Sequence, residues 1–561
     1  MNQNMPLRTG GQILVDCLKV HGVDLAFCVP GESYLAVLDA LYDMREQVRL
    51  IVCRQEGGAA FMAEAYGKLT GRPGICFVTR GPGATNASIG VHTAFQDSSP
   101  LILFIGQVGG DVVEREAFQE VDYRRMYGQM SKWVAQIDRA ERISEYVSHA
   151  FHLAVSGRPG PVVLALPEDM LRDQVVTAQT RPYHRVKPSA SPQALEEMVG
   201  LLEGAGKPLI IAGGGDWTAQ ACRDLRAFAE AWNVPVACSF RRQDLIDNRH
   251  RNYAGEIGIA ISPELKKRVR EADLIIAAGP RLGEMTTGGY TLFDLPRPRQ
   301  SFVHVHPGAE ELGRVYQADL MINSGMQEFA AAARGLPAPD GVPWGPWTQT
   351  LRQEYLLSLD PVSMPGQLNL SEAVAWLRSR LPENSIITNG AGNFSGWVQR
   401  FYQYTGFRTQ LAPTNGAMGY GVPAAVSAKL TYPERTVVCF AGDGDFLMNG
   451  QELATAVQYN AAVIFVVVNN GMYGTIRMHQ EREYPARVYA TALRNPDFAQ
   501  LAHAYGAYGA VVERTADFAP AFEKALATGG PAVLELRIDP EAISTRTTLT
   551  AVRDAALQAG R

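Results

Sequence analysis

The chain has 561 residues, of which 46% are hydrophobic and 19% are charged, and its formal net charge is −5 at pH 7. This length and composition predict roughly three or four well-packed domains. The acidic balance and the lack of a basic tail argue against nucleic-acid binding.

None of the seven cysteines forms a CxxC pair, and several, such as Cys76 and Cys439, lie in apolar segments. We interpret them as reduced core residues, which indicates a reducing compartment. The N-terminal segment has no signal-peptide core, and apolar runs such as AAVIFVVV are under ten residues, too short to span a bilayer. We therefore expect a cytoplasmic protein without a membrane partner.

Short apolar segments alternate with helical patterns over residues 1–176. This alternation is typical of a parallel sheet covered by helices on both faces. A polar, proline-containing stretch over 177–193 then reads as a linker. The strand-like segments of this first block are LAFCVPG, RLIVCRQ, GICFVT, PLILFIG and PVVLALP.

The same alternation recurs in two further blocks, over residues 191–335 and 369–540, before a tail over 541–561. The second block has strands in PLIIAGGG, DLIIAAGP and SFVHVHPG, and the third in SIITNGAG, TVVCFAGDGD, AAVIFVVVNN and PAVLELRID. The sequence therefore predicts an α/β protein with three doubly wound parallel-sheet domains.

Two strands of the third block end in oxygen-rich side chains. Asp443 follows TVVCFAG, Asn470 follows AVIFVVVN, and 24 residues separate the GDG and NN motifs. In open parallel sheets, ligands bind beyond the carboxyl ends of the strands, where Gly442 and Gly444 would let the backbone turn sharply. Carboxylate and amide oxygens suit Mg²⁺ or Ca²⁺. Each motif alone is also typical of an ordinary turn, but the pair predicts a metal site.

The GDG-x24-NN pattern resembles the cofactor motif of the thiamine-diphosphate enzyme superfamily, and the whole chain resembles its acetolactate synthase-like group. The resemblance implies a pyrimidine-binding domain, a central Rossmann-like domain and a diphosphate-binding domain, in that order. It also implies that Asp443, Asn470 and the Met472 carbonyl would ligate Mg²⁺. The implied cofactor-binding residues are Gly390, Gly392, Asn393, Phe394, Met418, Gly442, Asp443 and Gly444, the first four in the stretch NGAGNF.

Two side chains would activate the cofactor. Glu56 in CRQEGGAAF matches the family's activating glutamate, which hydrogen-bonds N1′ of the aminopyrimidine and favours its imino tautomer. Taken alone, a glutamate in the first turn of a helix more often complements the helix dipole. Met418 in PTNGAMGYG matches the apolar residue that holds the cofactor bent, although a methionine at a helix start is ordinarily a core residue.

Five residues are candidates for contact with substrate. Phe118 and Gln119 match the substrate-facing AFQE segment, and Gly31 ends the strand-like segment LAFCVPG. His92 follows GPGATN on the same predicted helix, where a packing role is the common alternative. His479 stands nine residues after the second Asn of the NN motif. Biosynthetic acetolactate synthases carry a Trp there that selects 2-oxobutyrate, so the histidine argues against that acceptor.

The middle block departs from the pattern of the acetolactate synthases that bind FAD. The segment GPRLGEM replaces their R-F-D-D-R stretch, and His306 in VHVHPG stands where an acidic residue would bind a ribose. The segment IAGGGDW also lacks a GxGxxG motif. These departures argue against FAD bound in the usual way.

The predicted activity is decarboxylation of a pyruvate-like 2-oxo acid, followed by carboligation to a second carbonyl. Three alternatives remain open: a decarboxylase or carbon–carbon lyase, including an acyl-CoA type, without carboligation; an oxidase with bound flavin; and a non-catalytic cofactor-binding protein. The resemblance also implies a homo-oligomer, at least a dimer and usually a tetramer, because Glu56 and the metal site face each other across a subunit boundary in this family.

Overall fold

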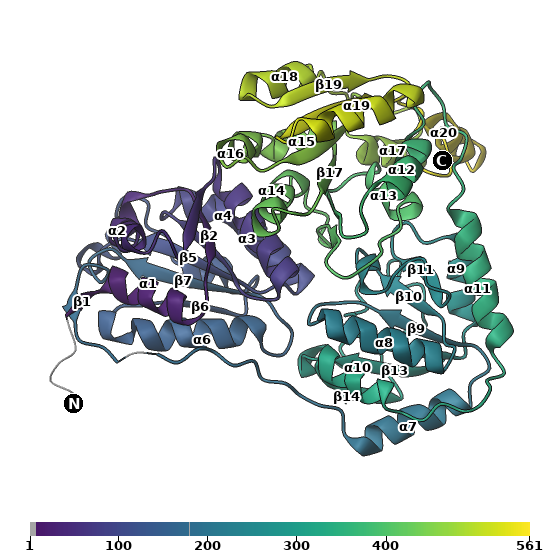
Figure 1. Cartoon of the computed structure of the whole chain (residues 1–561), viewed down its shortest axis with the longest axis horizontal. Helices are drawn as coiled ribbons and strands as arrows, with labels where there is room; N and C mark the ends of the chain where they lie inside the picture. The colour runs from purple at the N-terminus through teal and green to yellow at the C-terminus, as the bar shows by residue number, and fades with distance from the viewer. Residues whose placement is uncertain (1–6, 179, 561) are drawn as a thin grey trace. The chain divides into compact units, whose positions relative to one another are not determined.

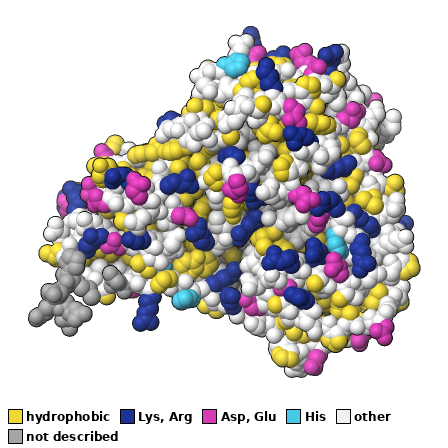
Figure 2. Space-filling view, in the orientation of Figure 1, with side chains coloured by type: hydrophobic (Ala, Val, Ile, Leu, Met, Phe, Trp, Pro, Cys, Tyr) yellow, Lys and Arg dark blue, Asp and Glu magenta, His cyan; other side chains and the backbone are white. Residues whose placement is uncertain are grey.

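The computed structural model describes residues 7–178 and 180–560. The chain divides into two compact units, one up to Lys187 and the other from Pro188 onward. Each unit is described separately below. On the face drawn in Figure 2, acidic, basic and hydrophobic side chains are intermingled over the surface. No helix within the described residues is long and apolar enough to cross a bilayer.

The first unit is built on a six-stranded parallel sheet with the strand order β3-β2-β4-β5-β7-β6. All seven residues of β5 are buried, as a strand covered by helices on both faces requires. The strands are β2 (Leu25–Cys28), β3 (Arg49–Val52), β4 (Gly74–Val78), β5 (Leu101–Gln107), β6 (Trp133–Gln136) and β7 (Pro161–Pro167). A two-stranded antiparallel pair, β1 (Arg8–Thr9) and β8 (Gln174–Val175), lies outside this sheet.

The helices of this unit pack on that sheet (Figure 1). They are α1 (Gly10–Val20), α2 (Leu35–Asp43), α3 (Glu56–Thr70), α4 (Pro82–Asp97), α5 (Tyr123–Tyr127) and α6 (Ile143–Val155). Helix α3 is buried along almost its whole length and packs closely against α4. Small residues allow this approach, since a Cβ on Gly90 would lie 2.4 Å from the Cβ of Ala60.

The second unit contains two six-stranded parallel sheets. The first has the order β11-β10-β9-β12-β13-β14, so the strand order reverses between β9 and β12. Its strands are β9 (Pro208–Ala212), β10 (Val236–Ser239), β11 (Tyr253–Ile257), β12 (Leu274–Ala278), β13 (Ser301–His306) and β14 (Leu320–Asn323). Its helices are α7 (Pro192–Glu203), α8 (Ala219–Ala231), α9 (Pro263–Glu271), α10 (Met326–Arg334) and α11 (Gly345–Ser358).

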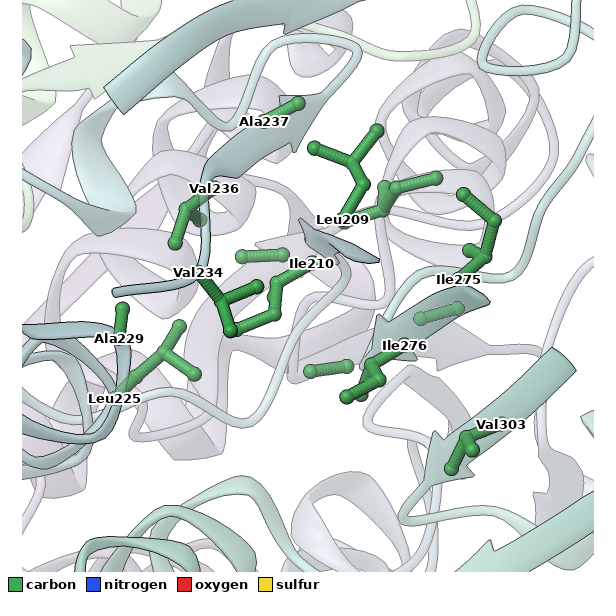
Figure 3. Close-up of a cluster of buried hydrophobic side chains, with 14 of the residues drawn as sticks. Leu209, Ile210, Leu225, Ala229, Val234, Val236, Ala237, Ile275, Ile276 and Val303 are labelled. Carbon is green, nitrogen blue, oxygen red and sulfur yellow. The ribbon is translucent and has the colours of Figure 1, made fainter. Parts of the chain in front are cut away.

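Aliphatic side chains from β9, β10, β12 and β13 form the core of this sheet (Figure 3). Leu225 and Ala229 on α8 extend the same cluster from the helical layer. The alternation of strand and helix patterns in the sequence follows from this layering.

The other sheet of the second unit has the order β16-β15-β17-β18-β20-β19. Its strands are β15 (Ile386–Asn389), β16 (Gln410–Leu411), β17 (Val437–Gly442), β18 (Val463–Asn469), β19 (Tyr508–Val512) and β20 (Ala532–Arg537). Its helices are α12 (Leu370–Arg380), α13 (Ser395–Phe401), α14 (Gly421–Thr431), α15 (Asp443–Asn449), α16 (Glu452–Gln458), α17 (Gly474–Glu483), α18 (Phe498–Tyr505), α19 (Thr515–Ala527) and α20 (Leu549–Gln558).

The prediction of three parallel α/β sheets is confirmed. The domain boundaries expected from the sequence stay a prediction, since the chain divides into two compact units. All seven cysteines are free thiols, and six of them are buried.

Candidate active site

A cavity of about 250 Å³ lies at the carboxyl ends of β15, β17 and β18. The register places these ends side by side, with Asn389 opposite Phe440 and Gly442 opposite Val468. The cavity lining combines most of the residues that the sequence predicted for the cofactor and the metal. These are Gly392, Asn393, Phe394, Met418, Gly442, Asp443, Gly444, Asn470 and Met472.

Asp443 is the buried carboxylate of this cavity, with 3% of its surface exposed. Its Oδ2 accepts hydrogen bonds from the Gly471 N–H at 3.0 Å and from Nδ2 of Asn495 at 2.7 Å. Burial raises the pKa of Asp443, and the bond from Asn495 acts in the opposite direction. A desolvated carboxylate of this kind is stabilised by a nearby cation, so the side chain fits a metal ligand.

Asn470 and Met472 lie together in the loop that follows β18. The Oδ1 of Asn470 accepts from the Met472 N–H at 3.2 Å. Backbone hydrogen bonds hold this loop in place, from the Tyr473 N–H to the Thr491 carbonyl at 2.9 Å and from the Leu493 N–H to the Gly471 carbonyl at 2.8 Å. The hard-oxygen donors of Asp443 and Asn470 thus line one cavity, as a Mg²⁺ site requires.

Gly444 does not turn the chain as the sequence analysis expected, because it is a helical residue of α15, which begins at Asp443. Its lack of a side chain is needed for packing instead. A Cβ on Gly444 would lie 2.6 Å from Cε1 of Tyr473, which also lines the cavity. The glycine therefore admits the aromatic ring rather than a sharp bend.

The NGAGNF stretch approaches a buried acid that the sequence analysis did not single out, Asp445. Its Oδ1 accepts from the Gly419 N–H at 2.8 Å and from the Ala391 N–H at 3.2 Å. Its Oδ2 is buried without a hydrogen-bond partner in the described parts of the chain. Burial raises the pKa of Asp445 to about 7. A Cβ on Gly390 would lie 2.1 Å from Oδ1 of Asp445, so only glycine fits there.

Together these features fit a diphosphate and its magnesium ion. The cavity offers a desolvated carboxylate, an amide oxygen, and backbone approached closely through glycines. The unpartnered oxygen of Asp445 is a buried acceptor that a hydrogen-bond donor of a bound group would satisfy. Met418 lines the same cavity and is half-buried.

Arg241, in the turn that follows β10, holds two loops of this cavity. Its guanidinium donates to the carbonyl of Pro413 and, from Nη2, to the carbonyl of Gly390 at 3.1 Å. Arg241 is 5% exposed and has a φ of 60°. No signal in the sequence pointed to Arg241 or Asn495, because both reach the site from distant positions in the chain.

In the first unit, Glu56 is the first residue of α3, just beyond the end of β3. Its Oε2 accepts from Nδ2 of Asn86 at 2.9 Å, and its Oε1 would lie 3.3 Å from a Cβ on Gly83. The side chain is half-buried. The carboxylate therefore lies at the carboxyl edge of this sheet, and its activating role stays a prediction.

Three substrate candidates lie near the end of β4. A Cβ on Gly31 would lie 2.5 Å from Cβ of Thr79, and Gln119 packs its backbone against Gly81. Phe118 is 71% exposed, and the Arg80 guanidinium lies 5.9 Å from its ring centre. The structure thus groups Gly31, Phe118 and Gln119 at one edge of the sheet.

The two histidine candidates are placed differently. His92 is an exposed residue of α4, nine residues beyond Gly83 and hence about 14 Å along the helix. His479 is exposed on α17, where its Nδ1 lies 3.4 Å from Nη1 of Arg482. Unlike Thr475 and Ile476 of the same helix, His479 does not line the cavity.

The switch point of the middle sheet, between β9 and β12, is closely packed. The indole N–H of Trp217 donates to the Gly213 carbonyl at 2.7 Å, and Trp217 is 4% exposed. A Cβ on Gly214 would lie 1.9 Å from the Gly279 carbonyl oxygen. His306 is buried and accepts the Gly308 N–H at 3.0 Å. The expectation that FAD does not bind in the usual way stays a prediction.

Comparison with known families gives three matches along the chain. Models of thiamine pyrophosphate enzymes match the N-terminal TPP binding domain at residues 8–126, the central domain at 195–333, and the C-terminal TPP binding domain at 390–536.

Curated relatives match over nearly the whole length. The chain is 32% identical to the acetolactate synthase isozyme 2 large subunit of Escherichia coli, covering 94% of this chain and 95% of the relative. It is 33% identical to the acetolactate synthase large subunit of Parasynechococcus marenigrum, over 89% of this chain and 83% of the relative. It is 30% identical to the mitochondrial acetolactate synthase of Schizosaccharomyces pombe, over 95% and 83%. The chain therefore belongs to the thiamine-diphosphate-dependent enzymes, in their acetolactate synthase-like group.

Proposed function

We propose that this enzyme decarboxylates a pyruvate-like 2-oxo acid and joins the remaining acyl fragment, which keeps the electron pair of the broken C–C bond, to a second carbonyl, as an acetolactate synthase does. The observation that carries the proposal is the meeting of Asp443, Asn470 and Met472 in one cavity beside the glycine-lined strand ends. The relatives named above are acetolactate synthases, which supports carboligation over simple decarboxylation.

Each residue has a distinct task in this proposal. Asp443 and Asn470 would hold Mg²⁺ through side-chain oxygens, with the Met472 carbonyl as a third ligand. Gly390, Gly392, Asn393 and Phe394 would receive the diphosphate, and Met418 would support the cofactor from its apolar side. When bound, thiamine diphosphate supplies a carbanion at C2 and accepts the electron pair released by decarboxylation.

Glu56 would hold a proton at N1′ of the aminopyrimidine and so act as the acid–base group of the reaction. Glu56 lies in the first unit and the proposed metal site in the second, and in this family the two face each other across a subunit boundary. We therefore propose a homodimer as the smallest active form, with a tetramer as the usual assembly. We also propose a cytoplasmic location. The proposal includes no FAD.

Substrate contact is assigned to Gly31, Phe118 and Gln119 at one sheet edge, with His92 and His479 as further candidates. The histidine at 479 supports an acceptor other than 2-oxobutyrate. Which carbonyl accepts the fragment is a matter for product analysis.

Carbon dioxide release with Mg²⁺ and thiamine diphosphate tests the activity directly. Pyruvate is supplied alone and with aldehyde or 2-oxo-acid acceptors, and products are identified by mass spectrometry. Acetolactate from pyruvate alone supports the synthase, whereas carbon dioxide with free acetaldehyde and no ligated product contradicts it. A yellow purified protein with a flavin spectrum would contradict the absence of FAD.

A further inference from the structure

A second cavity, of about 410 Å³, lies in the same unit as the cofactor cavity. Helix α13 contributes to both: Trp397 lines the cofactor cavity, whereas Gln399 and Arg400 line the second one. The tail over residues 541–561 also contributes to both, because Ile543 lines the cofactor cavity and Arg546 lines the second one. The other walls of the second cavity come from β11, the start of α9 and the end of α11. Nothing in the proposed reaction uses this cavity.

Two arginines bring positive charge to the second cavity. Arg400 donates from Nε to the Ser358 carbonyl and from Nη1 to the Thr545 carbonyl, both at 2.9 Å. Arg546 donates to the carbonyls of Ile261 at 3.0 Å and Ala260 at 3.2 Å. Burial lowers the pKa of Arg400, and the neighbouring Arg546 lowers it further. The two guanidinium groups are therefore close, and the hydrogen bonds that both donate go to neutral carbonyls.

The acidic side chains of the lining do not cancel this charge. Glu354 is paired with Arg268, whose Nε lies 3.1 Å from both of its oxygens. Glu256 is 8% exposed, and burial raises its pKa to about 7. Glu264 remains; burial lowers the pKa of both Arg400 and Arg546, and the charge of Glu264 opposes that lowering. Two guanidinium charges outweigh Glu264 and a partly protonated Glu256, so the lining favours a single negative charge.

The remaining lining suits a small organic body. Leu265, Leu357 and Pro263 provide apolar surface. Gln399 is 6% exposed, and its Nε2 is buried with no hydrogen-bond partner within the described residues. Buried amides of this kind are ordinarily satisfied, so an unpaired one beside a cavity points to a missing acceptor.

The second cavity is also connected to the cofactor cavity through hydrogen bonds. Oε1 of Glu256, in the lining, accepts the Arg241 N–H at 3.3 Å. The Arg241 guanidinium in turn binds the carbonyls of Gly390 and Pro413, which belong to the two loops of the cofactor cavity. A ligand that moves Glu256 would therefore move both loops.

We propose that the second cavity is an effector site for a small monocarboxylate with a short aliphatic body, and that its occupancy changes the affinity of the cofactor cavity through Glu256 and Arg241. The carboxylate is held by Arg400 and Arg546, since the guanidinium fork matches its two oxygens. The aliphatic body lies against Leu265 and Leu357. Only the coupling to the cofactor rests on the proposed function; the binding itself does not.

Calorimetric titration of the full-length chain with butyrate, without thiamine diphosphate or Mg²⁺, tests the binding. Butyramide, which has the same body without the charge, is the matched control ligand. We expect saturable binding of one butyrate per chain and at least tenfold weaker binding of butyramide. Equal binding of the two ligands overturns the site. So does the absence of butyrate binding at every concentration up to about 50 mM.

Two variants locate the bound carboxylate. Arg546→Gln should weaken butyrate binding about tenfold, and Leu357→Trp should block it by filling the mouth of the cavity. Arg223→Gln removes the same charge from an exposed arginine that does not line the cavity and should leave binding unchanged. The thermal midpoint of each variant confirms that it is folded. Unchanged affinity in both folded cavity variants contradicts the location.

The coupling is measured by titrating thiamine diphosphate and Mg²⁺ with and without saturating butyrate. We expect the cofactor Kd to change at least threefold, and by linkage the butyrate Kd must change by the same factor when cofactor is present. Unchanged cofactor affinity in a protein that binds butyrate overturns the coupling. Failure of cofactor to bind at all would instead contradict the proposed function, and the butyrate titration would stand apart from it.

Discussion

Nδ2 of Asn495 donates to Oδ2 of Asp443 at 2.7 Å, and the same amide donates to Oδ1 of Asn469 at 2.9 Å. The Gly471 N–H also binds Oδ2 of Asp443, so both of these bonds go to one oxygen of the carboxylate. Asn469 is anchored in turn, because its Nδ2 donates to Oε1 of the buried Glu535 at 2.9 Å. The proposed metal ligand is therefore oriented by a chain of hydrogen bonds that runs back into β20.

Replacing Asn495 with alanine should weaken Mg²⁺ binding about 10- to 100-fold, as loss of an orienting partner does at other metal sites. Trp397 lines the cavity and reports the binding by its fluorescence. Asn384→Ala, at an exposed asparagine outside the cavity, is the control. Mg²⁺ affinity that is the same in both variants would show that Asn495 does not orient the ligand.

Glu56→Gln and Asp443→Ala should separate chemistry from binding. The glutamine keeps the size of Glu56 but cannot exchange the proton at N1′, so turnover should fall nearly to zero while thiamine diphosphate still binds. Asp443→Ala removes a charged ligand, so Mg²⁺ and thiamine diphosphate should be lost together. Fluorescence titration and carbon dioxide release measure the two effects. Normal turnover of the Glu56→Gln variant would contradict the assignment of Glu56 as the activating residue.

The sequence predicted those site residues that belong to a recognisable local pattern. Asp443 and Asn470 each end an apolar strand, and parallel strands bring their carboxyl ends to one edge, so their meeting could be expected. Asn495 lies 52 residues from Asp443, and Arg241 lies 149 residues from Gly390. Partners at such separations are set by tertiary packing, which no local pattern records.

The misjudged role of Gly444 has a similar cause. Its neighbour Tyr473 comes from the loop after β18, so the need for glycine arises from packing between two strand ends. The short sequence GDG is compatible with either a turn or the first turn of a helix. In the structure, the strand passes directly into α15.

A buried ion cluster should fix the C-terminal helix α20 to α17. Glu481 has no exposed side-chain surface and accepts from Nε of Arg553 at 2.8 Å and from Nε of Arg477 at 3.1 Å. Glu481→Ala should therefore release α20, at a cost of roughly 2–4 kcal/mol, because it leaves two arginines without their anion. Hydrogen exchange of the α20 amides measures this directly. Asp517→Ala, which removes an exposed partner of Arg514, should leave the protection of α20 unchanged.

The same cluster gives a pH dependence. The bonds from Arg553 and Arg477 lower the pKa of Glu481 to about 2. A carboxyl group with a lowered folded-state pKa stabilises the fold above its unfolded pKa of 4.5 and loses that contribution as the pH falls toward 2. Protection of α20 should therefore persist at pH 5 and decline below about 4. Loss of protection already between pH 7 and 5 would contradict this role.

His21 should make the first unit sensitive to mild acid. Its ring is 5% exposed, stacks on Phe151 at 4.4 Å, and accepts the Tyr183 N–H through Nδ1 at 3.2 Å. Burial, with a contribution from His152, lowers its pKa to about 4 from the ordinary 6.5. The unfolded chain therefore binds a proton that the folded chain does not over this range, so the free energy of unfolding should fall as the pH drops from 6.5 toward 4. Urea midpoints at pH 7.5 and 5 measure the effect. His21→Gln cannot titrate and should reduce the difference between the two midpoints, whereas His503→Gln, at an exposed histidine, should not; an equal difference in both variants would exclude His21 as the source.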